Sequence, residues 1–178
     1  MDAAVQARKK AVLCVLISCM VAVCFFAIGT MFYKPVQTSG NSMSPTLKDG
    51  DRAIAGVLSY TPAYGDVVII KDLHRENKYI VKRIIGLAGD IINIDFGTGE
   101  VTRNGVKIDE PYLTEPTTMR GDIVFPLVVP QYHAFVMGDN RNNSTDSRTS
   151  YTGMIPLENI KGKVLLRFYP PQNFGKVK

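Results

Sequence analysis

The chain has 178 residues, a formal net charge of +5 and 46% hydrophobic residues. This length suffices for one globular domain with an appendage. The small basic surplus is scattered and lacks the basic stripe interleaved with aromatic residues that is typical of nucleic-acid binding. All three cysteines, Cys14, Cys19 and Cys24, lie in one apolar run. We therefore expect no disulfide framework, no metal site and no nucleic-acid partner.

The apolar run Ala11–Phe32 contains no charged residue. Its length, about 22 residues, is enough to cross a bilayer core as a helix. Arg8, Lys9 and Lys10 precede it, and basic flanks favour the cytoplasmic side, although Lys34 beyond the run weakens the contrast. We expect a cytoplasmic N-terminus at 1–10, a transmembrane anchor at 11–32 and an extracytoplasmic domain at 33–178.

A cleaved signal peptide is the alternative interpretation of this run. Ala27–Gly29 resembles a small-residue cleavage site. The apolar part of a signal peptide is usually about 7–15 residues long, which is shorter than this run. The anchor is therefore the favoured interpretation.

Beyond the anchor, Tyr33–Gly40 is expected to be a short extended link, because Pro35 discourages helix continuation. Short segments rich in Val, Ile and aromatic residues follow, separated by Gly, Asp, Asn or Pro. Asn104-Gly105 predicts a type I′ hairpin turn. The expected fold is mainly β: a single transmembrane helix followed by a compact antiparallel barrel or sandwich. The predicted strands are Ala53–Tyr60, Asp66–Lys71, Tyr79–Ile85, Ile91–Ile94, Glu100–Ile108, Ala134–Met137 and Lys163–Tyr169.

The stretch GNSMSPT, Gly40–Thr46, places two serines just after the anchor. A serine nucleophile needs a base. His74 lies in a charged turn, where it is expected to face water, and His133 begins an apolar strand, where a structural role is expected. The G-x-S-x-G elbow is absent. A Ser-His-Asp triad therefore has little support.

Lysine is a base when it loses its proton. An unperturbed lysine is neutral only about 0.04% of the time at pH 7, and burial among apolar groups raises that fraction. In YIVKRIIG, strand alternation places Ile80, Lys82 and Ile84 on one face. Arg83 points to the other face and keeps its charge. The alternative is that Lys82 extends its amine to solvent from a half-buried strand.

A third stretch, GDNRNNSTDSR at Gly138–Arg148, is densely polar and follows an apolar strand. It does not fit a calcium loop, because Arg141 stands where a ligand oxygen is needed. Hydroxyls and amides at this density are suited to orienting a lysine amine by accepting its hydrogen bonds.

Taken in order, these stretches resemble type I signal peptidases, membrane-bound Ser/Lys endopeptidases that remove signal peptides from exported proteins. The resemblance covers nearly the whole chain. The short interval between Lys82 and Gly138 is similar to the Gram-positive pattern. The motifs that carry it are SGNSMSPTL, GDVVII, YIVKRIIGLAGD, NGVKIDEPYL and GDNRNNSTDSR.

The resemblance implies a role for each matching residue. Ser42 is the nucleophile and Lys82 the general base, with no metal or cofactor. Ser144 is expected to hydrogen-bond the lysine and orient it. Asp146 and Arg148 are expected to pair and brace the loop that carries Ser144.

The same resemblance implies an oxyanion hole and further support. Asp139 is expected to help hold the polar loop, and the backbone N–H of Ser42 to form half of the oxyanion hole. Some members carry a serine two positions before the nucleophile, and here that position is Gly40. The second donor therefore stays open among a backbone N–H, a water and none before substrate binds.

Four apolar residues near the dyad are candidate substrate contacts. Met43 and Leu47 flank the nucleophile and are expected to meet lipid, substrate or both. Ile80 and Val81 are expected to line shallow pockets that admit small side chains at substrate positions −1 and −3. The implied partners are signal peptides, membrane lipid and a nearby secretion translocon.

Two other functions stay open. A specialised peptidase for pilins or a few exported proteins has the same motifs. From another class, a catalytically idle, membrane-tethered binding domain has the same anchor and β-domain.

Overall fold

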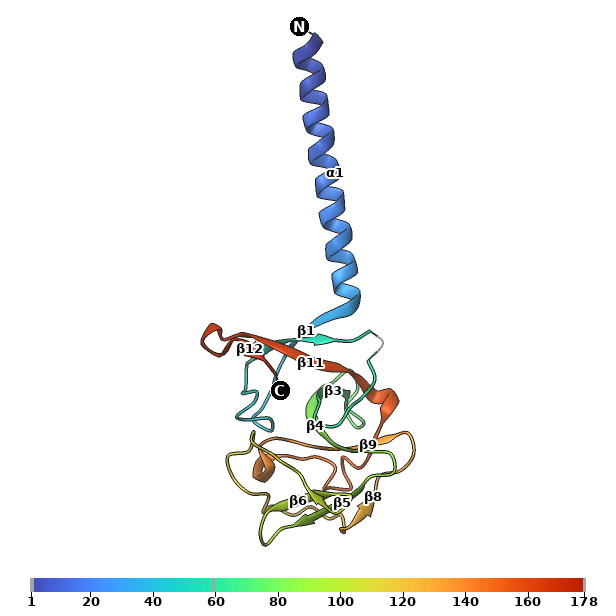
Figure 1. Ribbon diagram of the computed structural model, residues 1–178, viewed down its shortest axis with the longest axis vertical. Helices are drawn as coiled ribbons and strands as arrows, with labels where there is room; N and C mark the ends of the chain where they lie inside the picture. The colour runs from blue at the N-terminus through green and yellow to red at the C-terminus, as the bar shows by residue number, and fades with distance from the viewer. Residues whose placement is uncertain (1, 59, 178) are drawn as a thin grey trace.

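The computed structural model describes residues 2–58 and 60–177, and it consists of a long helix that projects from a β-domain (Figure 1). Helix α1 covers Asp2–Phe32. Its part Arg8–Phe32 is long and apolar enough to cross a membrane, and none of that window is buried by the β-domain. The helix begins well before the apolar run because residues 3–10 are mostly Ala, Gln, Arg and Lys, which are good helix formers.

Strand β1, Tyr33–Gln37, follows the helix without an intervening loop. It pairs antiparallel with β2, Arg52–Gly56, over five residue pairs. The Val57 N–H also donates to the Phe32 carbonyl at 3.0 Å. The segment expected to be a link is extended, as predicted, but it is an edge strand of the main sheet. Pro35 is tolerated there because an edge strand does not need every N–H.

The main sheet has the order β1-β2-β11-β3-β4-β9-β10, with β12 paired to β11, and it is antiparallel and curled. Every predicted strand overlaps an observed one, which confirms the mainly β fold. The remaining strands of this sheet are β3 Val67–Lys71, β4 Tyr79–Leu87, β9 His133–Met137, β10 Ile155–Pro156, β11 Ile160–Tyr169 and β12 Gly175–Lys176.

A smaller sheet, ordered β7-β6-β5-β8, lies at the end of the domain farthest from α1 (Figure 1). Asn104 and Gly105 have φ angles of 54° and 78°, so the hairpin turn predicted between β6 and β7 is confirmed. Short 3-10 helices cover Arg141–Asn143, Leu157–Asn159 and Pro171–Asn173. The strands are β5 Ile91–Asp95, β6 Glu100–Arg103, β7 Val106–Lys107 and β8 Leu127–Val128.

A glycine on β4 allows the two sheets to pack closely. A Cβ at Gly86 would lie 2.7 Å from Ile92 Cδ1 and 3.3 Å from Val129 Cγ2. The β4–β9 register shifts at this point, between Ile84 and Gly86. The two sheets therefore share one apolar cluster, which is formed by Ile85, Ile92, Ile94, Val101, Ile108, Val129, Phe135 and Met137.

The lipid contact expected for Met43 and Leu47 is wrong. Met43 is 3% exposed and Leu47 0%. Both side chains pack beneath the main sheet in a cluster with Ala53, Val67 and Val164. The stretch 40–47, called the nucleophile segment below, is therefore held to the core by its two large apolar residues.

Candidate active site

Ser42 and Lys82 come together from distant parts of the chain. Ser42 lies in the turn between β1 and β2, and Lys82 lies on β4 opposite Val68 of β3. The Lys82 Nζ donates to the Ser42 Oγ at 2.8 Å. Lys82 is 4% exposed. The alternative in which Lys82 reaches solvent therefore does not hold.

The alternation of side chains on β4 is visible in the apolar residues on either side of Lys82. Ile80 and Ile84 pack in one apolar cluster, whereas Val81 packs in another, as the alternation predicted. Burial lowers the pKa of Lys82 from 10.5 to about 8, although the carboxylates of Asp146 and Asp139 act in the opposite direction. A lysine with that pKa is neutral about 10% of the time at pH 7. The Lys82 amine is therefore neutral, and able to accept a proton, far more often at pH 7 than the amine of an ordinary surface lysine.

Arg83, the next residue along β4, is buried and closely paired. Its Nε and Nη2 atoms donate to the two carboxylate oxygens of Asp139 at 2.8 and 2.6 Å. Its Nη1 donates to the Gly65 carbonyl at 2.8 Å. Asp139 also accepts a hydrogen bond from Thr46 in the nucleophile segment. One ion pair therefore connects β4, the nucleophile segment and the polar loop that begins at Gly138.

Asp146 and Arg148 form the second ion pair that the resemblance implied. The Arg148 Nε and Nη2 atoms donate to the two Asp146 oxygens at 2.8 and 2.9 Å, and both side chains are buried. The Gly138 N–H also donates to Asp146 at 3.0 Å. Burial acts to raise the pKa of Asp146, but the hydrogen bonds and charge of Arg148 outweigh it and hold that pKa below its usual range.

The hydrogen bond expected between Ser144 and Lys82 is not formed. Among the residues that the structure describes, the buried Ser144 Oγ makes no hydrogen bond of ordinary geometry, but it lies near enough to the Asp146 carboxylate to help lower the pKa of that group. The Lys82 amine is directed to Ser42 instead. The Ser144 side chain packs against Gly138, where an added Cβ would lie 2.3 Å from its Oγ.

Gly138 is a site residue that the sequence analysis missed. A Cβ on it would also lie 2.4 Å from the Ser42 carbonyl oxygen. Asn140 strengthens the same junction, because its N–H donates to the Ser42 carbonyl at 3.0 Å and its side chain to the Asn41 carbonyl at 3.1 Å. The glycine that opens the polar motif was the available signal, but its close approach to Ser42 is a long-range contact.

Gly40 does not supply the second oxyanion donor. Its N–H donates to the Asp49 carboxylate at 2.8 Å. Its φ of +83° is one that glycine adopts at no steric cost. Gly40 therefore shapes the turn before Ser42, and its own N–H is occupied.

A cleft of about 440 Å³ opens beside the dyad. On one wall, β4 pairs with β3 from Tyr79 to Arg83, whereas β9 joins its other edge only from Arg83 onward. The Tyr79–Lys82 edge thus has no strand partner on that side within residues 2–58 and 60–177. Met43, Ile80 and Val81 line the cleft, and Leu47 does not. The full lining is Gln37, Thr38, Ser39, Gly40, Asn41, Ser42, Met43, Arg75, Lys78, Tyr79, Ile80, Val81, Lys82, Asn143 and Thr145.

The two histidines lie apart from the dyad cleft. His74 is exposed, as expected, and its ring stacks on Tyr151 at a centroid distance of 4.2 Å. His133 contacts the Gln131 carbonyl at 2.7 Å. Neither lines the cleft.

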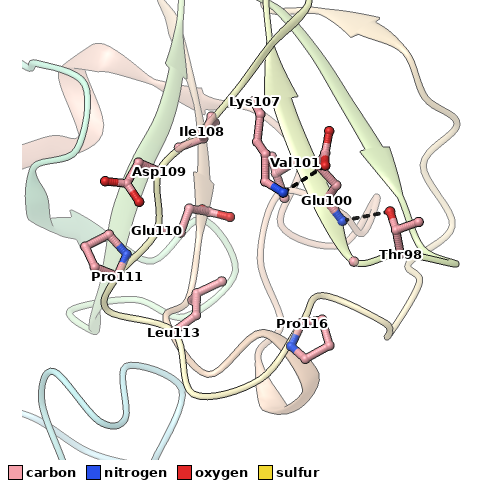
Figure 2. A pocket seen from close by; sticks show the side chains of 11 residues that line it. Thr98, Glu100, Val101, Lys107, Ile108, Asp109, Glu110, Pro111, Leu113 and Pro116 are labelled. Atoms are coloured by element: carbon pink, nitrogen blue, oxygen red, sulfur yellow. Dashed lines mark hydrogen bonds and ion pairs between the residues drawn. The ribbon is translucent and has the colours of Figure 1, made fainter.

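A second hollow, of about 500 Å³, lies on the smaller sheet (Figure 2). It shares no lining residue with the dyad cleft. Lys107 and Glu100 form an ion pair across its wall at 2.9 Å. Because it lies apart from Ser42 and Lys82, the first cleft is the candidate active site.

The Ser42 hydroxyl accepts a hydrogen bond from Lys82, a buried lysine with a lowered pKa, in an open cleft. This is the geometry of a serine hydrolase with lysine in the position of the base. Residues 8–169 match the family model described as signal peptidase, peptidase S26. The chain belongs to this family, and it is a serine endopeptidase of the type I signal peptidase class.

Individual relatives agree. The chain is 38% identical to signal peptidase I U of Bacillus subtilis (strain 168), over 96% of this chain and 92% of that protein. It is 35% identical to signal peptidase IB of Staphylococcus aureus (strain COL), over 93% of this chain and 94% of that protein. A solved signal peptidase I from Enterococcus faecalis V583 superposes with a TM-score of 0.50 at 27% identity, covering 58% of this chain and 97% of that chain.

Proposed function

We propose that Ser42 is the nucleophile and Lys82 the general base with which this chain removes signal peptides from exported preproteins. The 2.8 Å hydrogen bond between the two side chains is the observation that carries this assignment. The burial that lowers the pKa of Lys82 supplies the neutral amine that the reaction needs.

The chemistry is acyl transfer in two halves. Neutral Lys82 takes the proton of the Ser42 hydroxyl as the oxygen attacks the scissile carbonyl, and it then protonates the departing amine. The Ser42 N–H is half of the proposed oxyanion hole. A water that Lys82 deprotonates then releases the acyl group from Ser42.

The two ion pairs act as supports in this scheme. Asp139, bound to Arg83 and Thr46, fastens the nucleophile segment to β4. Asp146, bound to Arg148, fastens the polar loop. The Ser144 hydroxyl lies near the Ser42 carbonyl oxygen, because both approach the same side of Gly138. It is available to the Lys82 amine once Ser42 is acylated.

The open edge of β4 suits an extended substrate. A peptide that adds to an unpaired strand edge gains backbone hydrogen bonds, and pockets for alternate side chains give specificity. Ile80 and Val81 line the cleft along this edge, and they are the proposed walls of the pockets for small side chains at −1 and −3. Val81→Phe is expected to change the residue preference at −3, and an unchanged preference would count against this pocket.

The membrane placement is also a proposal. With α1 crossing the bilayer and its basic end cytoplasmic, the dyad cleft lies outside the cell, close to the surface where a signal peptide emerges. In intact cells, a membrane-impermeant thiol reagent is then expected to label Ser150→Cys and to leave Gln6→Cys unlabelled. The reverse pattern would overturn the orientation. Proximity to the secretion translocon stays a prediction.

The face of the main sheet below α1 is suited to lipid. A hollow of about 640 Å³ on this face is almost wholly apolar. It is continuous with the span, since Phe26 and Thr30 of α1 contribute to it together with Ile54, Leu166 and Phe168. Charge introduced by Phe168→Asp is expected to reduce activity in liposomes more than in detergent. Equal losses in both would contradict a lipid contact.

The decisive experiment uses the purified full chain in detergent with a preprotein, and it maps the cut by mass spectrometry. Ser42→Ala and Lys82→Ala are each expected to lower kcat/KM by about 10³-fold or more. Lys71→Ala, at an exposed site on the end of β3, is the matched control and is expected to cut normally. If Lys82→Ala cuts the same bond at the wild-type rate, the assignment is wrong.

A further inference from the structure

One sequence motif, NGVKIDEPYL, has no place in the scheme above. Its second half belongs to a strap, defined as residues 108–121, which leaves β7 of the smaller sheet and runs toward the polar loop. Figure 2 shows its first part, with Ile108, Glu110, Pro111, Leu113 and Pro116 along it. The strap therefore connects the far sheet to the segment that supports the dyad.

Tyr112 of the strap lies against both buried guanidiniums next to the dyad. The Arg83 guanidinium carbon stands 3.8 Å from the centre of the Tyr112 ring, and that of Arg141 stands 5.9 Å from it. The Tyr112 hydroxyl donates to Glu110 at 2.9 Å. Glu110 also accepts hydrogen bonds from Arg141. Arg83 therefore lies at the face of the ring, whereas Arg141 lies at its hydroxyl end, where the Arg141 Nη2 donates to the Tyr112 hydroxyl at 3.4 Å.

Each of these arginines reaches one half of the dyad. Arg83 is adjacent to Lys82 on β4 and is bound to Asp139. Arg141 donates from Nε to the Gly138 carbonyl at 3.1 Å, and Gly138 packs against the Ser42 carbonyl. A displacement of either arginine is therefore transmitted to Lys82 or to Ser42 through one residue.

The strap also closes over the polar loop beyond Tyr112. The Asn142 carboxamide oxygen accepts from the N–H groups of Thr118 and Met119, each at 3.0 Å. The Met119 carbonyl accepts from Arg148 at 2.9 Å. These contacts hold the polar loop from outside, whereas Tyr112 contacts Arg83 and Arg141.

We propose that Tyr112 is a positioning residue for peptide cleavage: its ring keeps Arg83 and Arg141 in place, so that the Lys82 amine stays dry and within reach of the Ser42 hydroxyl. The proposal rests on the proposed roles of Ser42 and Lys82. Tyr112 does not line the dyad cleft, so it acts through the two arginines rather than on substrate.

A positioning role differs from a purely structural one in its effect on the Lys82 amine. Tyr112→Leu keeps much of the apolar volume but removes the ring face under Arg83. The Arg83–Asp139 pair then loosens. The Asp139 carboxylate, which acts to raise the pKa of Lys82, and the water that enters beside it move that pKa from about 8 toward 10.5. Each unit of upward shift in the pKa of Lys82 lowers kcat/KM about tenfold at pH 7. The deficit shrinks as the pH rises past the new pKa.

The test compares full-length variants in detergent by the pH profile of kcat/KM on a preprotein. Tyr112→Leu is expected to move the rising limb of this pH profile upward by about one pH unit and to lower kcat/KM about tenfold at pH 7. Tyr112→Phe, which keeps the ring, is expected to stay within about threefold of wild type. Tyr112→Met, with a more adaptable side chain, carries the same expectation as the Leu variant if that variant does not fold.

Phe96→Leu is the matched control. Phe96 lies under the Arg120 guanidinium at 5.1 Å and packs on the core next to the smaller sheet. Its loss removes a ring beneath Arg120, a cation of the same strap that is not one of the two arginines next to the dyad. It is expected to leave the limb unmoved.

A second measurement separates this proposal from the proposed function. The pKa of Lys82 is followed by NMR of lysine labelled with ¹³C at Cε, in wild type and in Tyr112→Leu, with Lys82→Met identifying the signal. A higher pKa in Tyr112→Leu supports the positioning role whether or not the chain cuts a given preprotein. An unshifted pKa, or a loss of kcat/KM that is equal at every pH, overturns it. Wild-type protein that cuts no preprotein counts against the proposed function alone.

Discussion

Lys82 and Arg83 are neighbours on β4, and both are almost fully buried, at 4% and 2% exposed. They differ in what surrounds them. Arg83 meets both oxygens of Asp139, so its charge is matched in place. The amine of Lys82 donates to a serine hydroxyl, which carries no charge to match it.

The comparison shows how one strand carries both the proposed base and a support for it. Burial without a directly bonded carboxylate lowers the pKa of Lys82, and the neutral amine becomes a base. Burial with a two-point carboxylate partner keeps Arg83 charged and makes it a rigid connection between segments. Strand alternation allows the two environments to lie 1 residue apart.

The largest expected effect comes from breaking the supporting pair. Arg83→Met leaves the buried Asp139 without its two-point partner, and removal of one member of a buried pair costs about 3–5 kcal/mol of unfolding free energy. Chemical denaturation of the full chain in detergent measures it. Arg103→Met is the control, because the Arg103–Asp90 pair is long, at 3.7 Å, and partly exposed. Arg103 also lies over the Tyr64 ring, and its expected total cost in unfolding free energy is about 1 kcal/mol. Equal costs for the two variants would show that the buried pair is worth no more than the exposed one.

Removal of the buried amine is expected to raise the free energy of unfolding, whereas loss of the Arg83–Asp139 pair lowers it. The pKa of Lys82 is about 8 in the folded chain, below its ordinary 10.5. Between these values the unfolded chain binds more protons, so Lys82 makes stability rise with pH across this window and imposes its full cost below pH 8. Lys82→Met is therefore expected to stabilise the fold by about 2–3 kcal/mol at pH 7.

The same denaturation experiment, repeated from pH 7 to 10, checks this sign. The gain from Lys82→Met should shrink as the pH rises. Lys71→Met, at an exposed position, is expected to change neither stability nor its pH dependence. A Lys82→Met protein that is less stable than wild type at pH 7 would show that the amine carries no desolvation cost.

A smaller effect tests the junction between the two regions. Gly138→Ala places a Cβ where Ser144 Oγ and the Ser42 carbonyl oxygen lie within 2.4 Å, so one of the segments must move. A displacement of this size is expected to lower kcat about 10²-fold. Gly175→Ala, which meets nothing within 4 Å, is the control. Near-normal kcat in Gly138→Ala would mean that the junction does not set the position of Ser42.

The smallest expected effect is on the pH limb itself. The Asp146 carboxylate acts to raise the pKa of Lys82, so Asp146→Asn is expected to move the limb of kcat/KM to lower pH. Disorder of the loop is expected to lower the plateau about tenfold. The pH profile separates the two effects. An upward shift would mean that water entry, rather than charge, dominates the change.

Regular periods in the sequence were sufficient for the seven predicted strands and for the burial of Lys82, but not for the edge strand β1 or the short strands β8, β10 and β12. The alternation in YIVKRIIG placed Lys82 among apolar neighbours, and Asn104-Gly105 set a hairpin turn, because both rules act over a few residues. The nucleophile turn follows no such period. The apolar residues Met43 and Leu47 were therefore assigned partly to lipid, whereas both point into the core.

Contacts between distant segments were beyond sequence reasoning. The N–H of Gly40 is bound by Asp49 across a turn, and Tyr112 meets Arg83 only after the strap crosses from the smaller sheet. Such contacts depend on tertiary packing, which pattern rules do not encode. The resemblance to a family supplied the site residues Asp146 and Arg148, but not the packing of Gly138 against Ser42.

The central claim is that burial keeps the Lys82 amine poised to lose its proton near neutral pH. The most direct measurement is an NMR titration of the Lys82 Cε signal in the full chain, identified by its absence in Lys82→Met. The account predicts a midpoint near 8. A midpoint near 10.5, the ordinary value for lysine, would show that the amine is hydrated and charged, and Lys82 would then not be the base.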